Sequence, residues 1–280
     1  MKECLTQLLV HLDATAHASR RLAVARAIAH GQGAALTALY AVTPALVEIP
    51  FAPDAGPNVA QVLCELDDER RANVRAGFDR ANLEGLHAAW AEVRDYPVMP
   101  AFARQALYAD LLVLGQHDGS DPAATGVPAD FVESVLAESG KPALVLPYTQ
   151  ASASLGEIVV VAWKPTREAA RAISAAVPLL QRAQRVHVVS WSRDEADVIE
   201  GNGLDLDGYL KLRGIEPVWH REGGGEPDRL GDLLLSRAAD LDADLLVMGC
   251  YGHSRAREWV LGGTSRTILQ SMTLPVLMAH

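Results

Sequence analysis

Cysteine is scarce in this chain, and the three residues present, Cys4, Cys64 and Cys250, lie far apart. An odd number of widely spaced thiols does not suit a disulfide framework or a four-thiolate metal site. We therefore expect each thiol to belong to a small buried hydrophobic residue, in a protein of the reducing cytoplasm.

Long apolar runs and concentrated positive charge are also missing. No window reaches the roughly 18 apolar residues of a membrane-spanning helix, and His11 and Asp13 interrupt the first apolar run too early for a signal peptide. The 25 Lys and Arg residues are scattered among 35 Asp and Glu residues. Nucleic acids bind a concentrated positive face, so the sequence predicts a soluble cytoplasmic protein without a nucleic-acid or membrane partner.

Several catalytic and metal-binding motifs are absent from the sequence. It has no G-x-S-x-G turn, no G-x-x-x-x-G-K-[ST] phosphate loop, no G-x-G-x-x-G fingerprint and no H-E-x-x-H pair. No motif places an acid–base pair, so we expect no catalytic residue and no metal site. His187 lies inside an apolar run and is expected to be a core residue.

What the chain does contain is an internal repeat. DLLVLG at 110–115 and DLLVMG at 244–249 are each followed by a loop, a helical pattern and an apolar run that begins with proline. The preceding halves align as well, with Asp13 against Lys164 and Thr15 against Thr166. We therefore predict two tandem domains, 1–149 and 156–280, joined near 148–156.

Short, continuous runs of Val, Leu and Ile alternate with helical segments in both halves. Such runs are typical of parallel strands that are covered on both faces. The expected strands lie near 7–12, 35–42, 86–94, 110–114 and 142–146, and near 157–162, 185–190, 215–220, 244–248 and 274–278. The predicted fold class is α/β, with two doubly wound domains that each contain a five-stranded, mostly parallel sheet. A shortened helix is expected between the second and third strands of the second half.

Glycines follow the second DLLV run at a fixed spacing, with Gly249, Gly252 and the pair Gly262–Gly263 before a helical pattern. In an open parallel sheet, ligands bind outside the carboxyl ends of the strands. Glycine there permits the close approach of another backbone or a ligand, and a following helix, capped by Thr264 or Ser265, offers N–H groups to an anion. Glycines between a strand and a helix are also ordinary punctuation, so both interpretations stand at this point.

The pattern G-x2-G-x9-G at 249–262, together with the tandem repeat, resembles the nucleotide loop of the universal stress protein family. The resemblance implies the adenine nucleotide alpha hydrolase-like fold. It also implies an adenine nucleotide, commonly ATP, with or without Mg, which some members of the family bind and others do not. It also implies nucleotide contacts at the ends of the first and second strands and along the glycine loop. These positions are Ala162, Trp163, Lys164, Val188, Met248, Gly249, Gly252, His253, Arg255, Gly262, Gly263, Thr264 and Ser265.

Two positions depart from the family pattern. Lys164 replaces an acidic residue after the first strand, where it either meets phosphate or points into water, and Gly263 stands where Ser or Thr is usual. His253 and Arg255 either screen phosphate charge or form a solvated basic loop. Trp163 ends a strand beside the expected base.

The first half departs in the opposite way. It keeps Asp13 and Thr15 after its first strand, but Asp118, Asp121 and Asp130 replace the glycine loop. Carboxylates repel a phosphate, so we expect this half not to bind ATP in the usual way.

Two hypotheses of different classes follow. The first is a nucleotide-binding regulator of the stress response, not an enzyme, with at most slow ATP hydrolysis. The second is a nucleotide-free scaffold of the same fold that binds an unidentified protein partner. The resemblance also implies that the last strands of the two halves pair as a pseudo-dimer, which itself can form a further homodimer.

Overall fold

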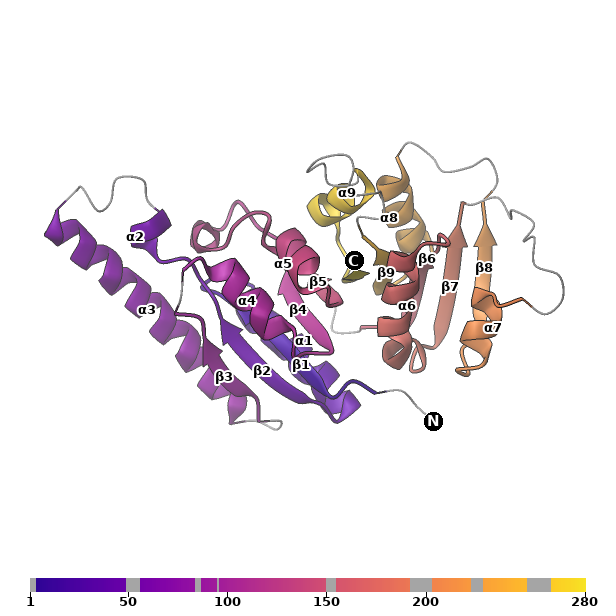
Figure 1. Cartoon of the computed structure of the whole chain (residues 1–280), viewed down its shortest axis with the longest axis horizontal. Coiled ribbons are helices and arrows are strands. Elements are labelled where there is room, and N and C mark those ends of the chain that lie inside the picture. Colours follow the sequence, from indigo (N-terminus) through magenta and orange to yellow (C-terminus); the bar gives the residue numbers. More distant parts are fainter. Residues whose placement is uncertain are drawn as a thin grey trace. The chain divides into compact units, whose positions relative to one another are not determined.

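The computed structural model describes residues 4–48, 56–83, 87–94, 96–149, 155–191, 203–222, 229–250 and 263–280 (Figure 1). The described chain divides into two compact units. The first unit is Cys4–Tyr148, and the second contains Thr149–His280. Each unit is an α/β domain with five strands.

The sheet of the first unit is parallel, with the strand order β3-β2-β1-β4-β5. Its strands are β1 (Gln7–Leu12), β2 (Ala35–Tyr40), β3 (Ala89–Glu92), β4 (Leu111–Gly115) and β5 (Ala143–Leu146). Its helices are α1 (Ala18–Gln32), α2 (Ala45–Glu48), α3 (Pro57–Asn82), α4 (Val98–Ala106) and α5 (Phe131–Ser139), with a short 3₁₀ helix at Pro122–Gly126.

The second unit repeats this arrangement with the order β10-β9-β6-β7-β8, again with parallel pairs. Its strands are β6 (Ile158–Ala162), β7 (Arg185–Ser190), β8 (Pro217–Arg221), β9 (Leu245–Gly249) and β10 (Val276–Ala279). Its helices are α6 (Arg167–Leu180), α7 (Leu206–Lys211), α8 (Leu230–Asp240) and α9 (Gly263–Ser271). The expected shortened helix is α7, and the predicted fold class is confirmed.

The central strands form because their side chains are covered on both faces. In β4, Leu111, Leu112, Val113 and Leu114 are all fully buried, and Val159 to Val161 of β6 are equally buried. Alternating exposure would instead indicate a sheet with one wet face. Helices on both sides therefore remove the central strands from water and leave their carboxyl ends as the accessible edge.

The aspartate of each DLLV run has a structural role. Asp110 accepts hydrogen bonds from the backbone N–H groups of Thr6 and Gln7, where β1 begins. Asp244 likewise accepts from Gly156, Glu157 and Ile158 at the start of β6. The repeated acid therefore fixes the entry of the neighbouring strand in both units.

Some side-chain expectations were wrong. Cys4 and Cys64 are exposed, and only Cys250 is buried among the described thiols. Neither Thr264 nor Ser265 is the residue before α9, because that helix already begins at Gly263. His187 is buried as expected, and its Nδ1 lies 2.9 Å from Nε2 of His220 on the adjacent strand. No helix in the described ranges is long and apolar enough to cross a membrane.

Candidate functional site

The carboxyl ends of β6 and β9 form the centre of the predicted site. The two strands are parallel neighbours, with Val161 paired to Val247, so Ala162 and Gly249 end at the same edge of the sheet. The chain runs from β6 outward to β7 and β8, and β9 then lies on the other side of β6. This is the topological switch point of the second unit, where ligands of open parallel sheets bind.

Residues that follow β6 remain at this edge. The Trp163 N–H donates to the Val189 carbonyl, which continues the ladder one residue beyond β6. Trp163 is partly exposed, and Lys164 is exposed. The structure thus brings together the predicted positions at the ends of β6 and β9.

Two predicted positions have side chains in the core. Val188 lies inside β7, two residues before its end at Ser190, and is fully buried between its partners Val161 and Trp219. Met248 is also buried and pairs with Met278 of β10. Neither side chain is presented at the edge of the sheet.

Gly249 has a packing requirement of its own. A Cβ at this position would lie 2.5 Å from the Ala169 nitrogen and 2.6 Å from the Glu168 carbonyl carbon. Both belong to the first turn of α6, which crosses the end of β9 at this point. The close approach that was expected at Gly249 is therefore made by the protein's own backbone.

Glu168 is a charged residue at this edge that the sequence patterns did not indicate. Its side chain is buried, and it accepts a hydrogen bond from Arg167. Burial raises the pKa of Glu168, but the hydrogen bond and charge of Arg167 outweigh it, so the pKa lies below its ordinary value. Burial and this carboxylate together raise the pKa of the Cys250 thiol. A negative charge thus lies beside the end of β9.

The first turn of α9 supplies the remaining described positions. Gly263 is exposed, Thr264 is partly exposed and Ser265 is buried. This turn packs on α8, where a Cβ at Gly231 would lie 3.2 Å from the Thr264 carbonyl oxygen. Gly252, His253, Arg255 and Gly262 lie outside the described residues.

In the first unit, Asp13 is held by its own domain. Its Oδ1 accepts from the N–H and hydroxyl of Thr15, and its Oδ2 accepts from Arg21 Nη2 at 2.6 Å. Burial alone would raise the pKa of Asp13, but Arg21, His11 and the Thr15 hydrogen bonds lower it to about 2. Asp13 therefore forms a buried ion pair with Arg21.

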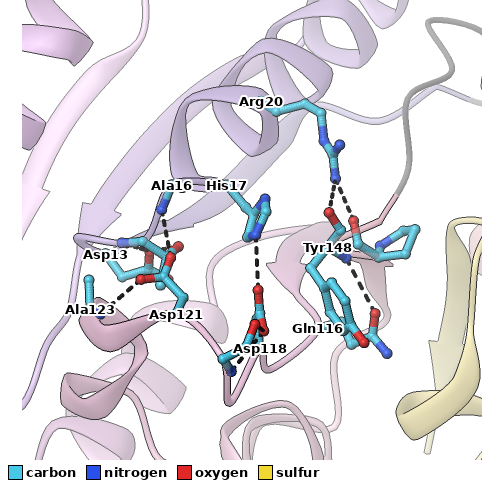
Figure 2. Close-up of polar contacts among 12 residues, drawn as sticks. Asp13, Ala16, His17, Arg20, Gln116, Asp118, Asp121, Ala123 and Tyr148 are labelled. Carbon is cyan, nitrogen blue, oxygen red and sulfur yellow. Dashed lines mark hydrogen bonds and ion pairs between the residues drawn. The ribbon is translucent and has the colours of Figure 1, made fainter.

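The acids of the β4–α5 loop are also bonded within the unit, as Figure 2 shows. Asp121 accepts from the N–H groups of Ala16 and Ala123, at 2.9 and 2.8 Å. Asp118 accepts from Ser120 and lies 3.2 Å from His17 Nε2. Asp121 thus occupies the Ala16 N–H at the entrance of α1, and the other donors to these carboxylates belong to the β4–α5 loop and to the His17 ring.

Among the described residues, no group of three or more His, Cys, Asp or Glu side chains is arranged to hold a metal ion. The two units thus differ at the same sheet edge: in the described part of the second unit it carries the ends of β6 and β9 and the first turn of α6, whereas in the first unit it carries hydrogen-bonded charged side chains.

Comparison with known proteins finds a family likeness in the second half. Residues 157–280 match the model of the universal stress protein family. No curated protein matches the chain.

Solved structures extend the likeness to the fold of the whole chain. A universal stress protein from Archaeoglobus fulgidus has a TM-score of 0.68 at 16% identity, over 98% of this chain and 97% of that one. A putative universal stress protein from Pseudomonas aeruginosa has a TM-score of 0.61 at 18% identity, over 98% and 92%. At these identities the likeness concerns the fold, which both halves of the chain share with these proteins.

Proposed function

We propose that this chain is an adenine-nucleotide-binding regulator of the stress response, with an ATP site in its second unit. One arrangement carries the proposal: β6 and β9 end together at the switch point, and residues 250–262 then lead into the exposed start of α9. Backbone N–H groups and the positive end of a helix dipole suit a phosphate chain. The resemblance of Gly249, Gly252 and Gly262 to the family's nucleotide loop points to the same ligand.

Trp163 and Lys164 have separate roles in this proposal. The partly exposed indole at the end of β6 lies against the adenine base, and the exposed ammonium meets phosphate with or without Mg. The role is binding, with any ATP hydrolysis slow or incidental. The cysteine usage supports a cytoplasmic location.

A second candidate, the nucleotide-free scaffold, is favoured by one observation. The buried Glu168 carboxylate and the α6 backbone lie against the end of β9. A negative charge there disfavours a triphosphate, and the α6 backbone already makes the close approach that Gly249 permits. The two candidates therefore differ in whether the purified protein contains nucleotide.

A matched pair of variants at Gly263 tests the proposal. No atom of the described residues lies within 4 Å of a Cβ at this exposed position, so the described structure has room for a side chain there. Gly263→Asp adds a carboxylate that suits the start of a helix but repels phosphate, whereas Gly263→Ala adds only a methyl group. We expect the Asp variant to weaken ATP binding by about tenfold or more, a difference of about 1.4 kcal/mol, while the Ala variant binds like the wild type.

The measurement is calorimetric titration of the full chain with ATP, together with mass spectrometry of nucleotides released on denaturation. Equal thermal stability of both variants would show that their folds are intact. If the wild-type protein releases no nucleotide and gives no heat at millimolar ATP, the proposal is rejected in favour of the scaffold.

A further inference from the structure

The first unit has a small pocket at the carboxyl edge of its own sheet, where β1, β4 and β5 end. One wall is apolar and is formed by Val127, Phe131, Val132 and Leu146. The rim carries His17, Arg20 and Asp118, which Figure 2 shows around Tyr148. An apolar wall with a few convergent polar groups is the usual composition of a small-molecule site.

Three basic side chains at the start of α1 line this pocket: His17, Arg20 and Arg21. Their spacing of three and four residues places them on one face of the helix. Arg21 is more than nine-tenths buried; its Nε donates to the His11 carbonyl and its Nη2 to Asp13. Within the described part of the chain, Arg21 Nη1 has no acceptor.

Arg20 also has unused donors. Its Nη2 donates to the carbonyl oxygens of Pro147 and Tyr148, and its Nε and Nη1 have no acceptor among the described residues. No carboxylate of the described chain lies within salt-bridge distance of Arg20. A half-buried guanidinium with unfilled N–H groups favours an acceptor that carries negative charge.

The charges around the pocket set a limit on that acceptor. Asp13 offsets Arg21, and Asp118 lies 3.2 Å from His17, which carries charge only when it is protonated. Among the described lining residues, Arg20 is therefore the one permanent cation without a carboxylate within salt-bridge distance. A triphosphate would bring several negative charges toward the carboxylates of Asp118 and Asp121, which already accept hydrogen bonds from the nearby donors Ala16 N–H and His17. A single carboxylate matches the one available charge.

We propose that the first unit binds a small monocarboxylate with an apolar body. The carboxylate accepts hydrogen bonds from Arg20 and from Arg21 Nη1, and the apolar part lies on Phe131, Val132 and Leu146. This site is separate from the nucleotide site of the second unit and takes a different class of ligand.

The test uses the full chain with benzoate, isovalerate and the neutral isostere benzamide as probes, followed by calorimetry and by amide chemical shifts of the protein. We expect benzoate and isovalerate to bind with a Kd of about 1 mM or lower, and benzamide at least about tenfold more weakly. Shift changes should concentrate at the ends of β1, β4 and β5. Saturating ATP should not displace benzoate.

Two variants move the affinity in opposite directions. Arg20→Gln removes the charge but retains a donor for the Pro147 carbonyl, and should weaken benzoate binding by about tenfold or more. Asp118→Asn keeps an acceptor for Ser120 but removes a negative charge, and should strengthen benzoate binding. Arg104→Gln on the exposed side of α4 is the matched control and should leave binding unchanged. Arg21 is not substituted, because that would leave Asp13 buried without its partner.

Three outcomes would overturn the proposal: no benzoate binding by the wild type at about 10 mM, equal binding of benzamide, or displacement of benzoate by ATP. Equal benzoate affinity in the wild type and the stably folded Arg20→Gln variant would also reject it.

Discussion

At the scale of single residues, the glycine after each DLLV run is explained by packing inside the protein. A Cβ at Gly249 would overlap the backbone of α6, and a Cβ at Gly115 would lie 2.1 Å from Arg21 Nη1. At the same position of the repeat, the glycine therefore packs against the α6 backbone in the second unit and against the Arg21 guanidinium in the first. At Gly249 the backbone contact requires glycine before any ligand is considered, whereas at Gly115 the end of the Arg21 side chain would have to move.

The substitution Gly249→Ala should destabilise the protein, because backbone atoms of α6 cannot move aside as a side-chain end can. We expect a loss of about 1–3 kcal/mol in the free energy of unfolding, measured by urea denaturation. Gly77→Ala, inside α3 with no atom near the new methyl group, should instead gain roughly 0.5–1 kcal/mol. Similar effects of the two substitutions would contradict the packing explanation.

His11 makes stability depend on pH. Its ring lies against Phe102 and Phe131, and Nε2 donates to the Ala41 carbonyl. Burial lowers the pKa of His11 from 6.5 to about 4, with Asp13 opposing and Arg21 assisting the shift. Between these values the unfolded chain binds more protons than the folded one, so stability falls as pH falls from 6.5 to 4.

The variant His11→Gln retains a donor for Ala41 but cannot be protonated. Its free energy of unfolding should therefore change less between pH 6.5 and 4 than that of the wild type, with a difference of at most about 3 kcal/mol across this window. His187 and His220, whose pKa values burial also lowers, leave a residual slope in both proteins. The exposed His87→Gln serves as the control, and a slope in the His11 variant equal to that of the control would reject the assignment.

At the scale of elements, the strands were predictable because burial on both faces demands continuous apolar runs. The run QLLVHL became β1 at 7–12, and LLVMG became β9 at 245–249. Helices lie between the strands, as the alternation of apolar runs and helical segments predicted, for example α8 between β8 and β9. The start of α9 was misplaced because the sequence alone did not distinguish Gly263 as the first helical residue from Gly263 as part of the loop.

The composition of the site was predictable only in part. Ala162 and Gly249 could be assigned to one edge because parallel neighbouring strands end together. The approach of α6 to Gly249, and the burial of Glu168 beside it, depend on how a helix crosses the sheet, which no local pattern encodes. The same holds for Arg21, whose long side chain fills the end of β4 from a different element.

At the scale of the whole molecule, the two units of the repeat share one fold but carry different side chains at the carboxyl ends of their strands. Each unit has five strands of its own, and in each an aspartate of the DLLV run fixes the start of the first strand. Units with separate cores can unfold separately. Substitutions at Asp110 and Asp244 therefore offer a way to recognise the unfolding of each unit within the full chain.

We expect calorimetric unfolding of the full chain to resolve two transitions. Asp110→Ala removes the acceptor for Thr6 and Gln7, so it should lower the unfolding free energy of the first unit by about 1–3 kcal/mol, and with it the temperature of that transition. Asp244→Ala should lower the unfolding free energy of the second unit by a similar amount. Asp68→Ala, which breaks an exposed ion pair with Arg71, is the control and should change the unfolding free energy of neither unit by more than about 0.5 kcal/mol.

ATP should distinguish the two units, because a ligand stabilises the unit that binds it. It should raise only the transition temperature that Asp244→Ala lowers. A single transition that both aspartate variants lower equally would mean that the two cores unfold as one.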